Sequence, residues 1–209
     1  MLPTLFVSHG SPDMGLTPSP TRDFLSALGD SLDRPRAILA VSAHFIEEEP
    51  TLTSHPNPPT VHDFQGFPNR LYEMTYPAPG EPALAQRIAE RITNAGMPAR
   101  LDPHRGLDHG AWTAIRLMYP EAEIPVVQLS LARSEDASYH YRLGQALRGL
   151  AAQGVLVLGS GGMSHNLRAL DWKGGARPSS AYEWVKEFTD WFADRTKAGD
   201  TAAKIDYRR

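Results

Sequence analysis

Three of the eight histidines in this sequence follow short apolar runs, in positions that suit metal binding. His9 comes after a run ending in Val7-Ser8, His44 after one ending in Ser42-Ala43, and His165 after a glycine-rich turn. Each position is the carboxyl end of a predicted strand, the edge at which open parallel sheets bind ligands. Because neutral imidazole is a common metal ligand, the pattern predicts that His9, His44 and His165 meet around one divalent ion.

Other interpretations of these segments stay open. A lone histidine near a strand end is more often a hydrogen-bonded structural residue, and this applies to each of the three. The glycine run Gly159–Gly162 lacks the lysine of a P-loop and the G-x-G-x-x-G spacing, so nucleotide binding is the weaker reading. Ser11 has no G-x-S-x-G sequence around it, which argues against a serine hydrolase.

Two further histidines, His62 and His109, stand at the predicted start of a loop or a helix. Both are candidates for acid or base groups, because imidazole titrates near neutral pH. The structural alternative has equal weight: His62 as a surface loop residue and His109 as an ordinary residue of a helix N-terminus. The remaining histidines are expected to be surface residues: His55, His104 and His140.

Alternating strand and helix patterns position these histidines. Four apolar, β-branched runs predict buried strands at Leu5–Ser8, Arg36–Ala43, Ile124–Leu131 and Gly154–Gly159. Helical periodicity predicts helices at Pro20–Leu32, Pro82–Ala95, Ala111–Met118, Ser134–Gln153 and Ser180–Lys197. This alternation predicts an α/β fold with a mostly parallel central sheet that helices cover on both faces. The proline-rich segment Glu47–Pro82 is expected to form a long loop that walls the site.

Composition excludes several classes of function. A chain of 209 residues with 41% hydrophobic residues can bury a core, so we expect a single domain over 1–209. Lys plus Arg number 21 against 24 Asp plus Glu, which is too few to indicate a nucleic-acid partner. Cysteine is absent, so a metal must bind through nitrogen and oxygen. The apolar runs are too short to span a bilayer, so we expect a cytoplasmic protein without a membrane partner. The sequence leaves the oligomeric state unknown.

Several motifs together resemble one family. They are His9-Gly10-Ser11-Pro12, Ser42-Ala43-His44, His62-Asp63-Phe64-Gln65-Gly66-Phe67-Pro68, Leu71-Tyr72 with Tyr76-Pro77-Ala78-Pro79-Gly80, Asp108-His109-Gly110-Ala111-Trp112 and Ser164-His165-Asn166-Leu167. In this order they resemble the DOPA-type extradiol aromatic ring-opening dioxygenases, members of the class III superfamily that includes protocatechuate 4,5-dioxygenase catalytic subunits. The resemblance runs from His9 almost to Arg209, and it implies the same α/β fold.

The resemblance also implies roles for single residues. His9 and His44 match the family's metal-binding histidines, and His165 matches a histidine that is a further ligand in some members and the catalytic base in others. His109 matches an acid or base histidine, and His62 matches a residue on the substrate side. Family members continue past Arg209 into a portion with another histidine or carboxylate ligand. We therefore expect this catalytic domain to lack that portion and the last metal ligand.

The implied activity is the opening of a catechol ring by O2 at a non-haem Fe(II) centre. Zn(II) is the alternative ion, since the same ligands bind both metals. Four aromatic residues are candidates for an apolar wall against the substrate ring, although they suit a core equally well: Phe64, Phe67, Tyr72 and Trp112. Two other functions stay open, a zinc-dependent hydrolase and a non-catalytic interaction module.

Overall fold

The computed structural model describes residues 2–166 and 183–208, which belong to two compact units, Met1–Gly161 and Gly162–Arg209. The first unit holds the sheet, while the described part of the second contains helices α6 (Glu183–Lys197) and α7 (Thr201–Ile205). Among the described residues, each helix is too short or too polar to cross a membrane. One domain over the whole of 1–209 stays a prediction.

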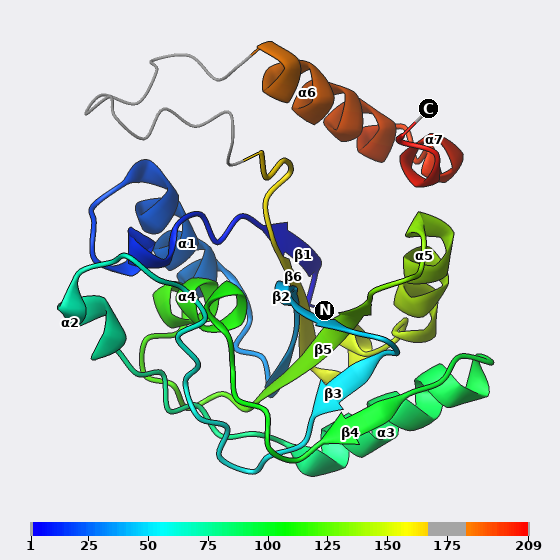
Figure 1. The fold of residues 1–209 in the computed structure, drawn as a ribbon. Coiled ribbons are helices and arrows are strands. Elements are labelled where there is room, and N and C mark those ends of the chain that lie inside the picture. The colour runs from blue at the N-terminus through cyan, green and yellow to red at the C-terminus, as the bar shows by residue number, and fades with distance from the viewer. Residues whose placement is uncertain (1, 167–182, 209) are drawn as a thin grey trace. The chain divides into compact units, whose positions relative to one another are not determined.

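Six strands form the sheet of the first unit, in the order β1-β6-β2-β5-β3-β4 (Figure 1). The first four in this order pair in parallel, whereas β3 runs antiparallel to β5 and parallel to β4. The bounds are β1 Thr4–Val7, β2 Ala37–Glu47, β3 Thr51–Thr53, β4 Arg100–Asp102, β5 Val126–Ala132 and β6 Val155–Ser160. The predicted, mostly parallel α/β sheet is therefore confirmed.

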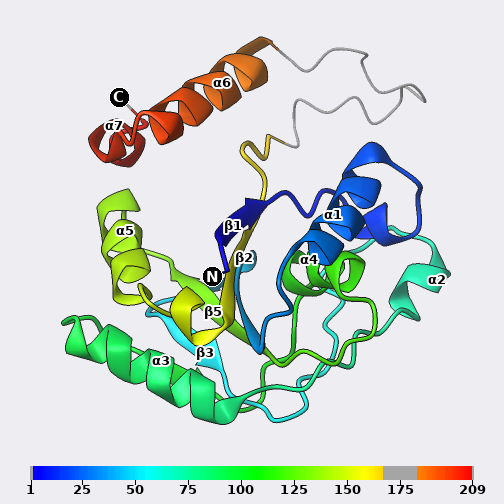
Figure 2. The same cartoon turned by 180° about the vertical axis from the view of Figure 1, so that it is seen from behind.

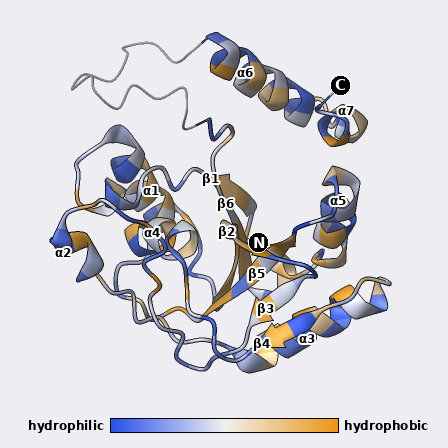
Figure 3. Ribbon diagram, viewed as in Figure 1, coloured by the Kyte–Doolittle hydropathy of each residue, from blue (hydrophilic) through white to orange (hydrophobic). Residues whose placement is uncertain are grey.

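The central strands are buried on both faces, as their continuous apolar sequences predict. In β2 the neighbouring residues Ile38 and Leu39 point to opposite faces, and neither is exposed to solvent. Ile38 belongs to a core shared with helix α4, and Leu39 to a core shared with helix α3. Hydropathy follows the same arrangement, with mostly hydrophobic strands and outer helices of mixed character (Figure 3).

Helices cover both faces of the sheet, as predicted. Helices α1 (Pro20–Ser31) and α4 (His109–Met118) lie against one face, and α3 (Pro82–Asn94) and α5 (Ala137–Ala146) lie against the other, an arrangement that both views show (Figures 1 and 2). Ser19 caps α1, where its side chain accepts a hydrogen bond from the backbone N–H of Arg22.

The structure corrects three details of the sequence prediction. Strands β3 and β4 were not predicted, because three residues give too short a pattern. The segment Glu47–Pro82 is not one loop, since it holds β3 and the short helix α2 (Asn69–Tyr72). The helix predicted over Ser134–Gln153 ends at Ala146, and a 3-10 turn follows at Ala151–Gln153. Gly149, which lies between these two elements, has a positive φ of +85°, a conformation that glycine adopts readily.

Candidate metal centre

Three imidazoles converge at the carboxyl ends of strands β1 and β2. His9 follows β1, His44 lies near the end of β2, and His109 is the first residue of α4. One ligand atom from each lies within 4.8 Å of those of the other two. The Nε2 atoms of His9 and His44 are 3.2 Å apart, and the rings of His44 and His109 are 4.0 Å apart between centroids. Such a group suits a single ion bound by nitrogen.

A break in strand pairing directs His44 toward this group. The register of β2 with β5 shifts between Val41 and Ile46, and His44 lies in that interval. Irregular pairing of this kind changes the direction of a side chain at the edge of a site. His44 therefore lies beyond the regularly paired part of β2, at the end of the sheet.

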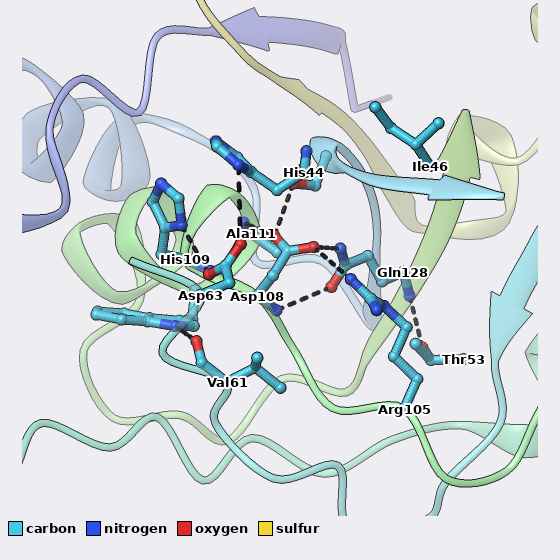
Figure 4. A network of polar contacts seen from close by, with 12 residues as sticks. His44, Ile46, Thr53, Val61, Asp63, Arg105, Asp108, His109, Ala111 and Gln128 are labelled. Atoms are coloured by element: carbon cyan, nitrogen blue, oxygen red, sulfur yellow. Dashed lines mark hydrogen bonds and ion pairs between the residues drawn. The ribbon is translucent and has the colours of Figure 1, made fainter. Parts of the chain in front are cut away.

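Oxygen atoms face the Nδ1 atom of each imidazole. Nδ1 of His9 lies 3.0 Å from Oγ of Ser160, and Nδ1–H of His109 donates to Oδ1 of Asp63 at 2.7 Å. Nδ1 of His44 is 3.7 Å from Oδ2 of the same carboxylate (Figure 4). Metal-bound histidines use their second nitrogen in this way, so Nε2 is the atom that each presents to an ion. The residues present thus fit a metal.

The group is buried on one side and open on the other. His9 is 4% exposed and His109 is 5% exposed, while the side chain of His44 is 28% exposed. Burial alone would raise the pKa of Asp63, but hydrogen bonds and the charge interaction from His109 outweigh it and lower the pKa to about 2. Asp63 is therefore an anion at neutral pH and a hydrogen-bond acceptor for the imidazole of His109.

A buried polar network lies beneath the imidazoles (Figure 4). Asp108 is fully buried and accepts hydrogen bonds from Oγ of Ser42 at 2.6 Å and from Nε2 of Gln128, and it pairs with Arg105 at 3.3 Å. Its side chain also caps α4 by accepting from the backbone N–H of Ala111. The network thus fixes the first turn of α4, which carries His109.

Gly110 allows this first turn to lie directly against β2. A Cβ atom at Gly110 would lie 2.3 Å from Oγ of Ser42 and 3.0 Å from Cδ2 of His44. Real side chains do not approach so closely, so any larger residue would displace one of these groups. The glycine is needed here for close packing and not for a special backbone angle.

Aromatic residues surround His62 beside the centre. Nε2–H of His62 donates to the backbone oxygen of Met74 at 2.9 Å, and its ring contacts those of Phe64, Tyr72 and Trp112. Phe64 also packs edge-on against His109, with 5.5 Å between centroids. His62 is thus linked to the metal centre through one aromatic ring.

The four aromatic residues predicted as a wall separate into two kinds. Trp112 is 1% exposed, belongs to the core and donates through Nε1–H to the backbone oxygen of Val61. Phe64 and Phe67 are half-buried and in ring contact, and Tyr72 is 37% exposed. A wall is therefore available from Phe64, Phe67 and Tyr72, with Trp112 behind them.

The sequence predicted only part of this group. His9 and His44 lie together as predicted, but the structure adds His109, which was expected to be an acid or base group. His165 is exposed and belongs to the second unit, so its role as a third ligand or as a base stays a prediction. The sequence did not predict the contacts of Asp63 and Ser160 with the histidines, although Asp63 directly follows His62 in one of the family motifs.

Comparisons with known proteins show the family of this chain. Residues 3–207 match the family described as the catalytic LigB subunit of aromatic ring-opening dioxygenase. The 4,5-DOPA dioxygenase extradiol of Escherichia coli K12 is 42% identical over 191 residues, which is 91% of this chain and 69% of that protein. The protein of the same name from Beta vulgaris is 42% identical over 194 residues, or 90% and 70% of the two chains.

A solved structure shows the same fold. The crystal structure of an uncharacterized protein from Escherichia coli K12 superposes with a TM-score of 0.78 and 34% identity, and it covers 99% of this chain and 79% of that one. The chain belongs to the LigB family of aromatic ring-opening dioxygenases. Within that family it is an extradiol ring-cleaving enzyme.

Proposed function

We propose that this enzyme opens the ring of a catechol-type substrate with O2, and that His9, His44 and His109 hold a ferrous ion for the reaction. The observation that carries this proposal is the convergence of the three imidazoles, each with an oxygen partner near Nδ1. Relatives named for 4,5-DOPA support a catechol as the substrate class. The cytoplasmic location stays a prediction.

Ferrous iron with open positions supplies two functions when bound: it lowers the pKa of a catechol hydroxyl, and it accepts both the catechol oxygens and O2. Three nitrogen ligands would leave coordination positions for these oxygens. Asp63 and Ser160 contribute by holding Nδ1 of the histidines, so that the nitrogen facing the ion is fixed before substrate arrives.

The side chains around Phe64 orient the substrate ring. Phe64 lies next to His109, and Phe67 and Tyr72 continue the same surface away from the centre. A flat aromatic substrate packs well against such edges and faces. His62 lies in this surface and donates Nε2–H to the protein backbone, which leaves Nδ1 to accept a hydrogen bond from a substrate group.

Anaerobic reconstitution tests the proposal directly. The protein is loaded with ferrous iron, mixed with DOPA, caffeate, protocatechuate or catechol, and its oxygen uptake is recorded. We expect uptake and a yellow ring-opened product with at least one substrate, and neither with the His44→Ala variant. If none of the four substrates gives oxygen uptake with the iron-loaded protein, the proposed dioxygenase activity is wrong.

The zinc-loaded protein separates the remaining functions. Zn(II) prefers the same nitrogen ligands, so it should bind the same residues. Because Zn(II) has no accessible redox chemistry, the zinc-loaded protein should give no oxygen uptake. Hydrolysis of ester or amide substrates by the zinc form, together with an inactive iron form, would favour a zinc hydrolase. Inactivity of both loaded forms would favour a non-catalytic interaction module.

A further inference from the structure

One carboxylate contacts two of the three imidazoles. Oδ1 of Asp63 accepts from the backbone N–H of His109 at 3.0 Å and from its Nδ1–H at 2.7 Å, while Oδ2 lies 3.7 Å from Nδ1 of His44. The side chain of Asp63 is 26% exposed, so solvent screens these contacts only in part. A single residue of the segment between β3 and α2 thus touches ligands carried by β2 and by α4.

The position of Asp63 is itself fixed by the start of helix α4. The backbone N–H of His109 lies in the first turn, where N–H groups lack partners within the helix. A carboxylate at this point gains from the positive end of the helix dipole as well as from the hydrogen bond. The helix therefore holds Asp63 in place, and Asp63 in turn holds the ring of His109.

Asp63 also stands next to the aromatic surface. The following residue, Phe64, packs against the rings of His109 and Tyr72, with 5.5 Å and 5.2 Å between centroids. Two consecutive residues, Asp63 and Phe64, therefore both contact His109, one through hydrogen bonds and the other through its ring.

We propose that Asp63 is a positioning residue of this centre, because its carboxylate selects the Nδ1–H tautomer of His109 and thereby directs Nε2 of His109 toward the metal. In its link to metal binding this inference rests on the function proposed above. Carboxylates that accept from metal-bound histidines act in this manner in other proteins, and their loss weakens metal affinity by about 10- to 100-fold.

The tautomers are measurable in metal-free protein. Long-range proton–nitrogen NMR spectra of the wild-type protein should show His109 with the proton on Nδ1. In Asp63→Asn, which keeps the size of the side chain but not its charge, we expect His109 to shift toward the Nε2–H form. A wild-type spectrum with the proton on Nε2 of His109 would overturn the proposal, and so would an unchanged tautomer in Asp63→Asn.

Metal affinity gives a second readout, with Asp136→Asn as the matched control. Asp136 caps α5 by accepting from the backbone N–H of Tyr139, and asparagine caps a helix equally well. Competition with a chelator should show ferrous iron bound about 10- to 100-fold more weakly by Asp63→Asn and unchanged by Asp136→Asn. Equal affinity in both variants would contradict the inference, whereas a wild-type protein that binds no iron would contradict the proposed centre instead.

Discussion

Nε2 of His9 lies 3.2 Å from Nε2 of His44, although 35 positions separate the two residues in the chain. Strand β6 lies between β1 and β2 in the sheet, so two strands that are not neighbours deliver these atoms to one point. Two nitrogens bound to one ion at about 2.0–2.1 Å lie at a similar separation. The spacing therefore has the scale of a shared metal ion.

Removal of either histidine should abolish stoichiometric metal binding. His9→Ala and His44→Ala each delete one nitrogen from a group of three, and two imidazoles bind an ion far more weakly. The exposed His104 gives the control, because its replacement by alanine changes no contact with the centre. Metal content after iron loading, measured by mass spectrometry, should fall only in the first two variants, and equal content in all three would count against the site.

Gly110→Ala should destabilise the protein and weaken metal binding. The new Cβ would overlap Oγ of Ser42 and press on His44, and overpacking of this kind costs about 1–3 kcal/mol. Gly144→Ala in α5 is the control, since nothing lies within 4 Å of its added Cβ and alanine favours helix. Urea unfolding should give a lower free energy for Gly110→Ala and an equal or higher one for Gly144→Ala. A higher free energy of unfolding for Gly110→Ala than for Gly144→Ala would show that Gly110 does not pack closely against Ser42 and His44.

Asp108→Ala should be among the most damaging substitutions. It leaves the half-buried Arg105 and the buried Gln128 without their acceptor and removes the cap of α4, a loss of roughly 3–5 kcal/mol. Asp136→Ala removes only a helix cap and should cost about 1 kcal/mol. Denaturant unfolding of both variants measures the difference, and similar losses would mean that the network contributes little.

Acid should destabilise the metal-free protein in part through Asp63. Its pKa is about 2 in the folded protein and ordinary in the unfolded chain, so it stabilises the fold above about pH 4. That contribution falls as the pH drops from about 4 to 2, because the unfolded chain binds the proton first. The free energy of unfolding should fall less steeply over this range in Asp63→Asn than in the wild-type protein. If the free energy of unfolding falls equally steeply with pH in both proteins, the pKa of Asp63 is not lowered by the fold.

His62→Phe should impair substrate binding and leave metal binding intact. Phenylalanine keeps the ring contacts with Phe64 and Tyr72 but loses the Nδ1 acceptor and the hydrogen bond to Met74. We expect KM for the catechol to rise about 10-fold at unchanged metal content, the effect of losing roughly one hydrogen bond of about 1.4 kcal/mol. Loss of bound iron would instead place His62 in the metal centre.

The sequence predicted the sheet better than the site. Strands such as β2 and β6 are buried on both faces, so their apolar runs stand out, whereas the three residues of β3 or β4 leave no pattern. Helix α4 begins two residues before the predicted Ala111, because Asp108 caps it. That shift places His109 on the first turn, facing the other two imidazoles.

The imidazoles after strands were predictable because parallel strands end at one edge of a sheet. The roles of Asp63 and Ser160 were not, since each acts across the fold, 46 and 151 positions from the histidine that it contacts. Sequence spacing carries no signal for such contacts. The family resemblance marked Asp63 as part of a motif without showing that its carboxylate faces His109.

The strand before His9 has only four residues, and within the described residues it pairs with β6 alone. His44 and His109, in contrast, extend from a central strand and from a helix packed in the core. A short border strand opens more readily than the interior of a sheet. One residue of the proposed metal centre is therefore carried by a strand that the sheet supports on one side, and local opening of that strand would remove His9 while His44 and His109 stay in place.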